Sequence, residues 1–218
     1  MRNIDSYTHT RGESVYLDDI PEIAGTLNAA VYGSPEAHGI IKQLHLDDAL
    51  AVKGVVKILT NKDIPGKNQI GGIVKDEPLL ADGVVHFNGM PVAIVVAENA
   101  DAAHEAVKKI KIDIEPLPVV TLARVAQQNG ALIVPPRTFK IGDSQSAFAQ
   151  CKYIFEGIAE TNGQEHLYIE TQGAYAIPVE NGAIKIYSST QGPTAVQKHC
   201  AEVLDVPMHK VEIDTTRL

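Results

Sequence analysis

The sequence predicts a mixed α/β and α+β fold that is divided between two domains. Strand-like and helix-like segments alternate from residue 26 onward, and a strand, a helix and a second strand follow one another over residues 90–114. A stretch with two adjacent prolines near its end, residues 117–137, separates these elements from a second set. A chain of 218 residues can hold two modest domains, because one hydrophobic core typically serves about 100–200 residues. We therefore expect domains over residues 25–116 and 138–218.

Residues 1–24 show no clear periodicity and are predicted to form an extended N-terminal arm. Within it, Asp18 and Asp19 could suggest a pair of metal-binding carboxylates. Adjacent side chains on an extended chain point to opposite faces, however, so these two cannot converge on one metal without help. A solvated turn before Pro21 is the favoured interpretation.

The first domain is expected to begin with strands over residues 27–32 and 40–46, which the loop GSPEAHG separates. A short helix over residues 47–52 follows. Asp47 is its expected N-cap, and Gly54 is expected to close it. These elements continue the alternation of strands and helices.

Residues 55–59 form the next predicted strand. Their apolar residues are β-branched and nearly continuous, which favours a strand that is covered on both faces. Residues 60–80 then combine several glycines and prolines with no periodicity, which predicts a long loop. Loops of this length are more often functional or partner-facing than idle, but a plain surface excursion remains the favoured interpretation.

The clearest local unit is residues 90–114. Residues 91–97 predict a strongly apolar strand, and Asn99 is a good N-cap for the helix that follows. The charges of Asp101 in its first turn and of Lys108 and Lys109 in its last turn complement the helix macrodipole. Its apolar stripe consists of Ala102, Ala103, Ala106 and Val107. Residues 111–115 alternate and predict an edge strand, reached by a right-handed crossover. His104 has no other ligand-type side chain at suitable spacing and is interpreted as an exposed structural histidine.

The linker, residues 117–137, is predicted to contain a short helix around residues 122–128. The second domain should open with a helix that Asp143 caps and that runs through Gln150. New strands are expected from Tyr153 onward.

The last predicted elements are a strand over residues 184–188 and a helix that begins at Pro193, a residue well suited to the first helical turn. An apolar stripe along this helix indicates the face that packs against the strand. The stripe consists of Val196, His199, Cys200, Val203 and Leu204.

The charge and cysteine content argue against several classes of function. The formal net charge is -8 and no basic cluster is present, so nucleic-acid binding is not expected. The longest apolar runs fall far short of the roughly 20 residues that cross a bilayer, and the polar N-terminus lacks a signal-like core, so we expect a cytoplasmic protein without a membrane span. Cys151 and Cys200 are too few and too far apart to build a zinc site or an iron-sulfur cluster alone. Two reduced, mostly buried thiols are expected.

The segment GQEHLYIET, residues 163–171, places His166 four residues before Glu170. This spacing would bring two metal ligands together on a helix, but the residues between them favour a strand, in which the separation is roughly 13 Å. A shared metal is therefore not expected. Gln164, Glu165 and His166 are interpreted as a hydrogen-bonded network that fixes the start of a strand.

The segment STQGP, residues 189–193, carries more chemical content. Gln191 lies at the junction between the last predicted strand and helix. Such a junction exposes backbone amides and the positive end of a helix dipole, which favour an oxo group or a phosphate. From the residues alone, a role for Gln191 in capping the turn is equally well supported, and both interpretations stay open.

Several phrases resemble the xanthine dehydrogenase and aldehyde oxidase family of molybdenum hydroxylases. GESVYLDDI resembles the opening segment of that family's first domain, and residues 34–68 and 76–107 resemble its α/β hammerhead domain nearly throughout. QEHLYIE is similar to the family's QEHFYLE, with Leu167 for Phe and Ile169 for Leu. The family's usual GQPV is GMPV here, so Met90 changes one side chain and leaves the turn intact.

The resemblance implies an α/β hammerhead domain over residues 25–116, followed after the linker by the first part of a molybdopterin-binding α+β domain over residues 138–218. It also implies that Gln191 binds the cofactor, as a group beside the metal's oxo ligand that is not itself a metal ligand. Family members continue past the equivalent of Leu218 into a glycine-rich cofactor loop. We therefore expect an N-terminal portion of a catalytic subunit that is inactive alone, with its general base beyond Leu218 and no catalytic residue or metal ligand of its own.

The implied reaction is hydroxylation of an electron-poor carbon in a purine, another N-heterocycle or an aldehyde, with water as the oxygen source. The implied cofactor is molybdenum-molybdopterin, with iron-sulfur clusters and FAD on companion domains or subunits. The implied partners are those companions, the remainder of the molybdopterin-binding subunit and a small-molecule substrate. A non-catalytic interaction or scaffold module that retains the hammerhead fold is the alternative.

Overall fold

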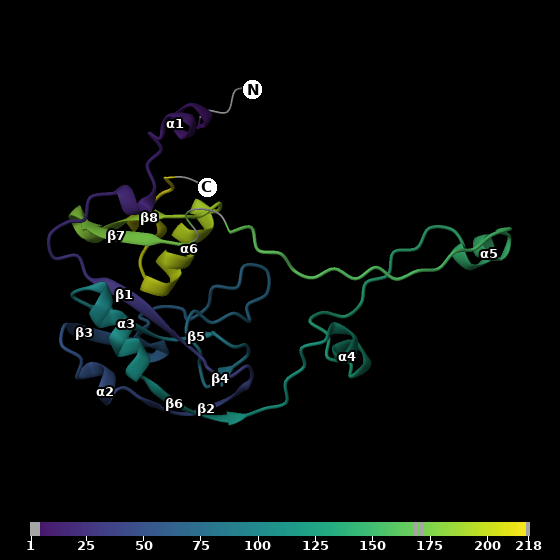
Figure 1. The fold of residues 1–218 in the computed structure, drawn as a ribbon, viewed down its shortest axis with the longest axis horizontal. Helices are drawn as coiled ribbons and strands as arrows, with labels where there is room; N and C mark the ends of the chain where they lie inside the picture. The colour runs from purple at the N-terminus through teal and green to yellow at the C-terminus, as the bar shows by residue number, and fades with distance from the viewer. Residues whose placement is uncertain (1–4, 168–169, 171, 217–218) are drawn as a thin grey trace. The chain divides into compact units, whose positions relative to one another are not determined.

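The computed structural model describes residues 5–167, 170 and 172–216, and Figure 1 shows its elements. The chain divides into two compact units, of which the first is Met1–Val119 together with Tyr168–Leu218 and the second is Val120–Leu167. Among the described residues, the first unit contains three small sheets and the second contains no strand.

Short helices occur in the N-terminal segment, so the prediction of an extended arm over residues 1–24 is wrong for part of its described length. α1 (Ser6–Arg11) and η1 (Leu17–Asp19) both lie within it. The Asp19 carboxylate accepts a hydrogen bond of 2.9 Å from the Tyr16 amide and thereby caps η1. Single turns of this kind are held by local capping bonds, which leave no periodic signal in the sequence.

The first sheet has the strand order β1-β5-β3 with antiparallel pairing. β5 (Pro91–Ala97) lies between β1 (Asn28–Gly33) and β3 (Val55–Thr60). β3 is an edge strand in which Val56 is 55% exposed, so the prediction that it is covered on both faces is wrong. A run of β-branched residues suits an edge strand as well as a buried one, and the pattern cannot separate the two. The buried residues of β5 are Val92, Ala93, Val95 and Ala97.

α3 (Ala100–Lys109) packs on β1 and β5, as the sequence predicts for its apolar stripe. Asn99 is the N-cap, and its Oδ1 accepts a hydrogen bond of 2.9 Å from the Ala102 amide. His104 is exposed, in agreement with the prediction. The core below the helix consists of Ala30, Ala49, Val52, Ile58, Ala93, Val95, Ala97, Ala102, Ala103, Ala106 and Ile110.

The second sheet has the order β4-β2-β6, also antiparallel. β2 (Gly39–His45) lies in the centre, β6 (Lys111–Pro116) is the predicted edge strand, and the two-residue β4 (Val84–Val85) was not predicted. Because β5 and β6 lie in different sheets, the predicted right-handed crossover is wrong. That rule applies to parallel strands of one sheet, and the sequence does not show which sheet a strand joins.

α2 (Asp47–Leu50) is shorter than predicted, and its N-cap is Leu46. Asp47 lies in the first turn instead, where its negative charge still complements the helix dipole. The predicted long loop over residues 60–80 is confirmed, apart from the single turn η2 (Asn61–Asp63). Side-chain and backbone hydrogen bonds, rather than regular structure, hold this loop.

The third sheet has the order β7-β8-β9. β7 and β8 form an antiparallel hairpin, and β8 and β9 pair in parallel through the crossover helix α6. In chain order the elements are β7 (Ala174–Val179), η3 (Glu180–Gly182), β8 (Ala183–Ser188), α6 (Pro193–Leu204), η4 (Met208–Lys210) and β9 (Val211–Asp214). α6 begins at Pro193 as predicted, but its most buried residue is Ala201, 4% exposed, which the predicted stripe omitted. Ala201 packs with Ile186 and Val211.

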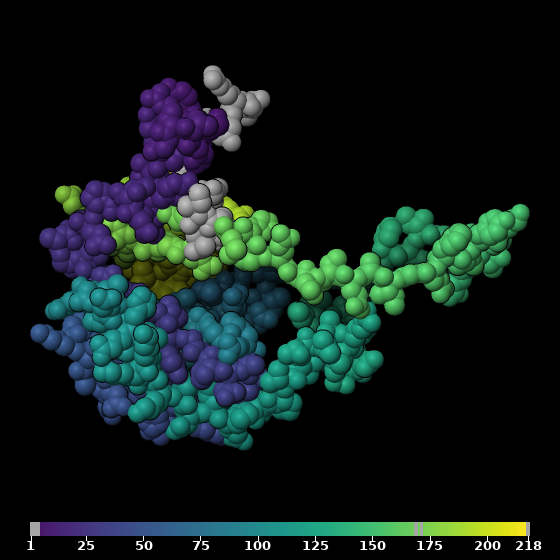
Figure 2. Space-filling view, in the orientation of Figure 1, coloured from purple at the N-terminus to yellow at the C-terminus, as the bar shows by residue number. Residues whose placement is uncertain are grey.

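The second unit contains α4 (Ala123–Gln128) and α5 (Ser144–Ala149). The predicted cap of α5 is confirmed, since the Asp143 carboxylate accepts from the Ser146 amide. The strands expected from Tyr153 onward do not form in residues 153–167. Every residue of the unit is exposed except Ala126, which is half-buried, and Figure 2 shows a thin run of atoms with no packed body. A strand needs a neighbour, and this unit offers none.

Candidate functional site

The parallel pair β8 and β9 gives the third sheet a polar edge. Tyr187 pairs with Asp214, so the chain leaves both strands at the same end, into Ser189 after β8 and Thr215 after β9. α6 starts at that end, after the turn that contains Gln191. Ligands of open α/β sheets typically bind beyond the carboxyl ends of parallel strands, and a helix N-terminus favours an anion. We take this edge as the candidate site.

Gln191 is exposed at this edge, and among the described residues its side chain makes no hydrogen bond. The residue that closes the turn is Thr190, whose Oγ1 accepts a hydrogen bond of 3.1 Å from the Gly192 amide. Gly192 is the N-cap of α6, with no side-chain cap. In the described structure the turn is thus closed by Thr190 and not by Gln191.

Two hydroxyl groups at this edge are buried without a hydrogen-bond partner in the described part of the chain. They are Ser189 Oγ and Thr215 Oγ1. A buried polar group with no partner costs about 1–3 kcal/mol, and such groups are rare enough that each calls for an explanation. Sequence reasoning missed Thr215 because only the parallel pairing of β8 with β9 brings it to the edge that Ser189 occupies.

A charged cluster lies just before this edge. Lys185 Nζ is 3.0 Å from Asp214 Oδ2 and 3.3 Å from Glu212 Oε1, and it lies 4.7 Å from the centroid of the Tyr187 ring. Its hydrogen bond with Asp214 is the main reason that the pKa of Lys185 is raised well above its usual range. The negative charge of Asp214 is thereby neutralised, so it opposes an anion at the start of α6 less strongly.

The GQEHLYIET segment is not assembled as predicted. Gln164, Glu165 and His166 are exposed, and the hydrogen bond in this group joins the His166 amide to its neighbour Glu165 at 2.9 Å. Tyr168 and Ile169 lie outside the described residues, so the strand expected there stays a prediction, and Leu167 has a φ of 49°, which is not a strand conformation.

Glu170 makes a contact that the sequence did not indicate. Its Oε1 accepts a hydrogen bond from the Leu17 amide, so it fastens the N-terminal arm to the segment before β7. Its other oxygen, Oε2, is buried with no hydrogen-bond partner among the described residues. Glu170 therefore has a structural role in this chain, which is to hold the N-terminal segment by this hydrogen bond.

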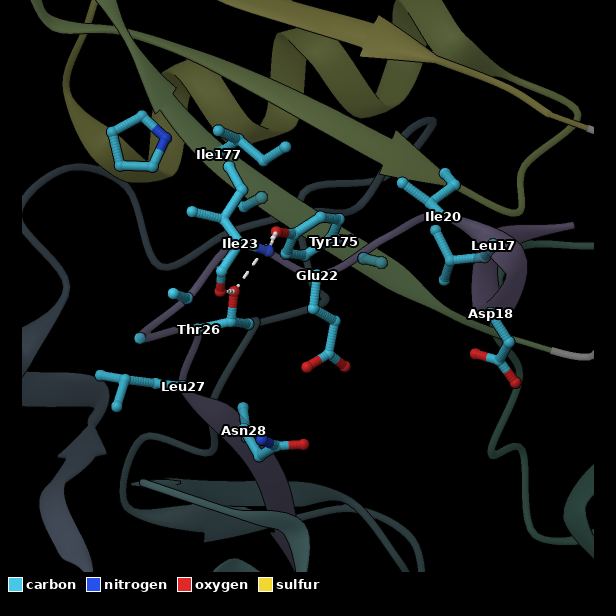
Figure 3. A pocket seen from close by; sticks show the side chains of 16 residues that line it. Leu17, Asp18, Ile20, Glu22, Ile23, Thr26, Leu27, Asn28, Tyr175 and Ile177 are labelled. Carbon is cyan, nitrogen blue, oxygen red and sulfur yellow. Dashed lines mark hydrogen bonds between the residues drawn. The ribbon is translucent and has the colours of Figure 1, made fainter.

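A groove of about 880 Å³ separates the N-terminal arm from β7 (Figure 3). The Tyr175 hydroxyl at its floor accepts a hydrogen bond of 2.9 Å from the Ile23 amide and lies 3.3 Å from Thr26 Oγ1. Its walls combine the apolar side chains of Leu17, Ile20, Leu27 and Ile177 with the polar side chains of Asp18, Glu22 and Asn28. Residues 189–192 do not line it, so it is separate from the polar edge.

The two cysteines differ in exposure. Both are free, but Cys151 is exposed and only Cys200 is half-buried, so the expectation of mostly buried thiols is wrong for Cys151. Burial raises the pKa of the Cys200 thiol. Cys151 follows α5 in the unit without a core, which explains its exposure. In the described residues, no helix has the length and apolar character to span a membrane.

Comparisons with known proteins identify the family. The model described as "Aldehyde oxidase and xanthine dehydrogenase, a/b hammerhead domain" matches residues 11–118, and that of the "Molybdopterin cofactor-binding domain" matches residues 125–218. The chain belongs to the xanthine dehydrogenase and aldehyde oxidase family. It combines the family's hammerhead domain with residues that match its molybdopterin-binding domain, which confirms the predicted fold class.

Individual relatives agree with this assignment. The chain is 34% identical to xanthine dehydrogenase of Emericella nidulans over 99% of its length, and 35% identical to aldehyde oxidase 2 of Rattus norvegicus over 100% of its length. It spans only 16% of each of these relatives.

Solved structures show the same relation. An aldehyde oxidoreductase from Desulfovibrio gigas superposes with a TM-score of 0.84 at 27% identity, covering 98% of this chain and 26% of that one. Quinoline 2-oxidoreductase from Pseudomonas putida 86 superposes with a TM-score of 0.85 at 26% identity, covering 100% of this chain and 30% of that one. The chain corresponds to less than a third of each relative.

Proposed function

We propose that this chain contributes to the molybdenum-containing catalytic subunit of a hydroxylase. The substrate would be a purine, another N-heterocycle or an aldehyde, and water would supply the oxygen. The observation that carries the proposal is the polar edge of the β8, α6 and β9 unit, which lies in the part of the chain that matches a molybdopterin cofactor-binding domain. Relatives named for xanthine and for aldehydes are about equally similar, so they leave the substrate class open.

The residues at this edge fit a polar cofactor. The Gln191 amide, the Ser189 and Thr215 hydroxyls and the backbone at the start of α6 would hold it, because these groups are either free or buried without partners in the described chain. The bound molybdenum cofactor would supply the capacity to accept electrons from the substrate. The contribution of this chain is to orient that cofactor, and no general base is assigned to it.

Electrons would then pass to iron-sulfur and flavin groups on companion domains or subunits. Cys151 and Cys200 are too few to hold a cluster, which usually needs four cysteine ligands. We therefore place those carriers outside residues 1–218.

The second unit supports assembly with the remainder of such a subunit. Its large apolar side chains are exposed, although each would stabilise the protein if it were covered. The most exposed are Ile133 at 97%, Phe155 at 92%, Phe139 at 86%, Ile141 at 81% and Ile158 at 81%. We propose that the domain boundaries lie at residues 25–116 and 138–218, with residues 117–137 as the linker, and that the remaining parts of the molybdopterin-binding subunit cover these side chains.

The test is a Gln191→Ala substitution in the assembled enzyme, with turnover normalised to bound molybdenum. A hydrogen bond to a charged group contributes about 1.5–3 kcal/mol, so turnover should fall roughly ten- to hundred-fold if the bond forms mainly in the transition state. The melting temperature should hardly change, because the side chain of Gln191 makes no hydrogen bond within the described chain.

Gln43→Ala is the matched control, because Gln43 is also an exposed glutamine of the first unit but lies in β2 of the second sheet, not in the sheet that precedes α6. It should leave turnover and melting temperature unchanged. A lower melting temperature with normal turnover in Gln191→Ala would restore the capping interpretation. Unchanged turnover at full metal occupancy would remove Gln191 from the cofactor site.

A further inference from the structure

The C-terminal end of α6 is held by a loop from the hammerhead domain. The last four carbonyl groups of a helix lack partners within the helix and must find them elsewhere. In α6 the Ala201 carbonyl accepts from the Asp205 and Val206 amides, the latter at 3.0 Å. The carbonyls of Glu202 and Val203 accept from amides of the distant loop over residues 60–80.

The two donors are neighbours in that loop. The Lys67 amide donates to the Glu202 carbonyl and the Gly66 amide donates to the Val203 carbonyl, each at 2.9 Å. The Lys67 side chain adds only an exposed ion pair, with 3.5 Å between Nζ and the Glu202 carboxylate, and such pairs contribute little. The backbone amides therefore make the connection.

The loop itself is fixed just beyond these donors. Asn68 closes it with two hydrogen bonds to Leu80, from Nδ2 to the carbonyl at 2.8 Å and from the Leu80 amide to Oδ1 at 2.9 Å. Leu80 is only 2% exposed, so this closure is anchored in the hammerhead domain. The hydrogen bonds of Asn68 thus fix the conformation of the loop directly after the donor amides of residues 66 and 67.

Only glycine fits at position 66. A Cβ there would lie 2.1 Å from the Glu202 carbonyl oxygen and 2.9 Å from the Asp205 amide nitrogen, and both are backbone atoms that cannot swing away. The requirement is for close approach of two backbones and does not come from a left-handed φ. Gly72 in the same loop has nothing within 4 Å of its added Cβ.

We propose that Gly66 and Lys67 are positioning residues that set the place of α6 along its axis and, through it, the place of Gln191. An α-helix of 12 residues is a stiff rod about 18 Å long, so a shift at its C-terminal end displaces its N-terminal end. Gln191 and the Gly192 N-cap sit at that N-terminal end. The loop thereby couples the hammerhead domain to the candidate cofactor edge. The consequence for catalysis rests on the proposed function, whereas the mechanical coupling does not.

The first experiment measures backbone amide hydrogen exchange in the 218-residue chain, for the wild type, Gly66→Ala and Gly72→Ala. Gly66→Ala should speed amide exchange about tenfold both at residues 199–206 and at residues 189–196. The reason is that the C-terminal cap of α6 loses about one hydrogen bond, whose net contribution corresponds to roughly a tenfold change in an equilibrium constant. Exchange in β5 should not change. Gly72→Ala should match the wild type throughout.

Lys67→Pro removes the second donor without placing a Cβ at position 66, and Lys67→Ala removes only the side chain. Lys67→Pro should reproduce the exchange pattern of Gly66→Ala, whereas Lys67→Ala should resemble the wild type. Faster exchange confined to residues 199–206 would overturn the proposal, because the cap would then act only locally. Loss of folding in both Gly66→Ala and Lys67→Pro would also overturn it, in favour of a purely structural role.

The second experiment uses the assembled enzyme. Gly66→Ala should lower turnover per bound molybdenum by about the same factor as Gln191→Ala with KM unchanged, and the double variant should lose little more than either single variant. If exchange at residues 189–196 responds but Gln191→Ala is fully active, the coupling stands and the proposed cofactor role fails. If Gln191→Ala is impaired but exchange at residues 189–196 does not respond to Gly66→Ala, the positioning role fails alone.

Discussion

Residues 25–116 and residues 120–167 are both rich in apolar side chains, but only the first segment buries them. In the hammerhead domain Val85, Ala93, Val95 and Ala106 are fully buried. In the second unit the described residues include no buried side chain. The difference shows that the amount of apolar sequence does not decide whether a segment folds by itself. What decides it is whether the chain also supplies the surfaces that cover those residues.

Limited proteolysis should show the largest effect of this difference. Cleavage within residues 120–167 should be at least about a thousandfold faster than cleavage within residues 91–114, because the former needs little opening and the latter needs most of the folding free energy. The fragments can be identified by mass spectrometry over a digestion time course. Early cleavage inside β5 or α3 would contradict the division of the chain.

The same comparison explains which parts of the fold the sequence predicts. The strand, cap and helix around Asn99 are predicted correctly because their signals are local and their packing partners lie within the same domain. The strands expected from Tyr153 onward do not form within residues 153–167, because a strand is stable only beside a neighbour and none is provided within residues 120–167. The edge position of β3 could not be predicted either, since strand order is a property of the whole sheet.

The residues of the candidate site also differ in whether a local sequence signal predicts their position. Gln191 could be placed at a strand-to-helix junction from sequence, because Pro193 marks the helix start locally. Thr215 could not, because its nearness to Ser189 depends on the parallel pairing of β8 with β9. The contact of Gly66 with α6 joins residues that are far apart in the chain, and no local pattern records it.

Substitutions of single apolar residues should show the next largest effect. Val95→Ala should lower the free energy of unfolding by about 2 kcal/mol, because Val95 is fully buried and the lost methyl groups leave a cavity. Phe155→Ala removes far more apolar surface, yet it should leave the unfolding free energy of the 218-residue chain unchanged, since Phe155 is 92% exposed. Urea denaturation followed by circular dichroism measures both.

In the assembled subunit, Phe155→Ala should have a larger effect on stability than Val95→Ala has in the free chain. If the remainder of the subunit covers this ring, Phe155→Ala should cost about 3–5 kcal/mol of assembly stability there, as truncation of a buried phenylalanine does. A destabilised free chain would instead mean that residues 120–167 have a core of their own.

Removal of the helix caps of α3 and α5 should give the smallest difference in stability between the two regions. Asn99 caps α3 and Asp143 caps α5, each through a side-chain oxygen that accepts an amide hydrogen bond, at 2.9 Å and 3.2 Å respectively. Asn99→Ala should cost about 1 kcal/mol of global stability, since α3 unfolds with the core. Asp143→Ala should leave global stability unchanged and should only speed amide exchange within α5, because no core depends on that helix. A lower global stability in Asp143→Ala would show that α5 packs against a folded body.

Acidification provides an independent test of the same caps. Hydrogen bonds from the Ser146 hydroxyl and amide hold the pKa of Asp143 below its usual range. A carboxyl group with a lowered pKa stabilises the folded form above its ordinary pKa, and that contribution is lost as the pH falls through the lowered pKa. Exchange at the Ser146 amide, corrected for the intrinsic effect of pH, should therefore speed up on acidification. Asn99 does not titrate, so the Ala102 amide should keep its protection over the same range, as long as the hammerhead core stays folded. Equal loss of protection at both amides would mean that the two helices unfold together, which would contradict the independence of the second unit.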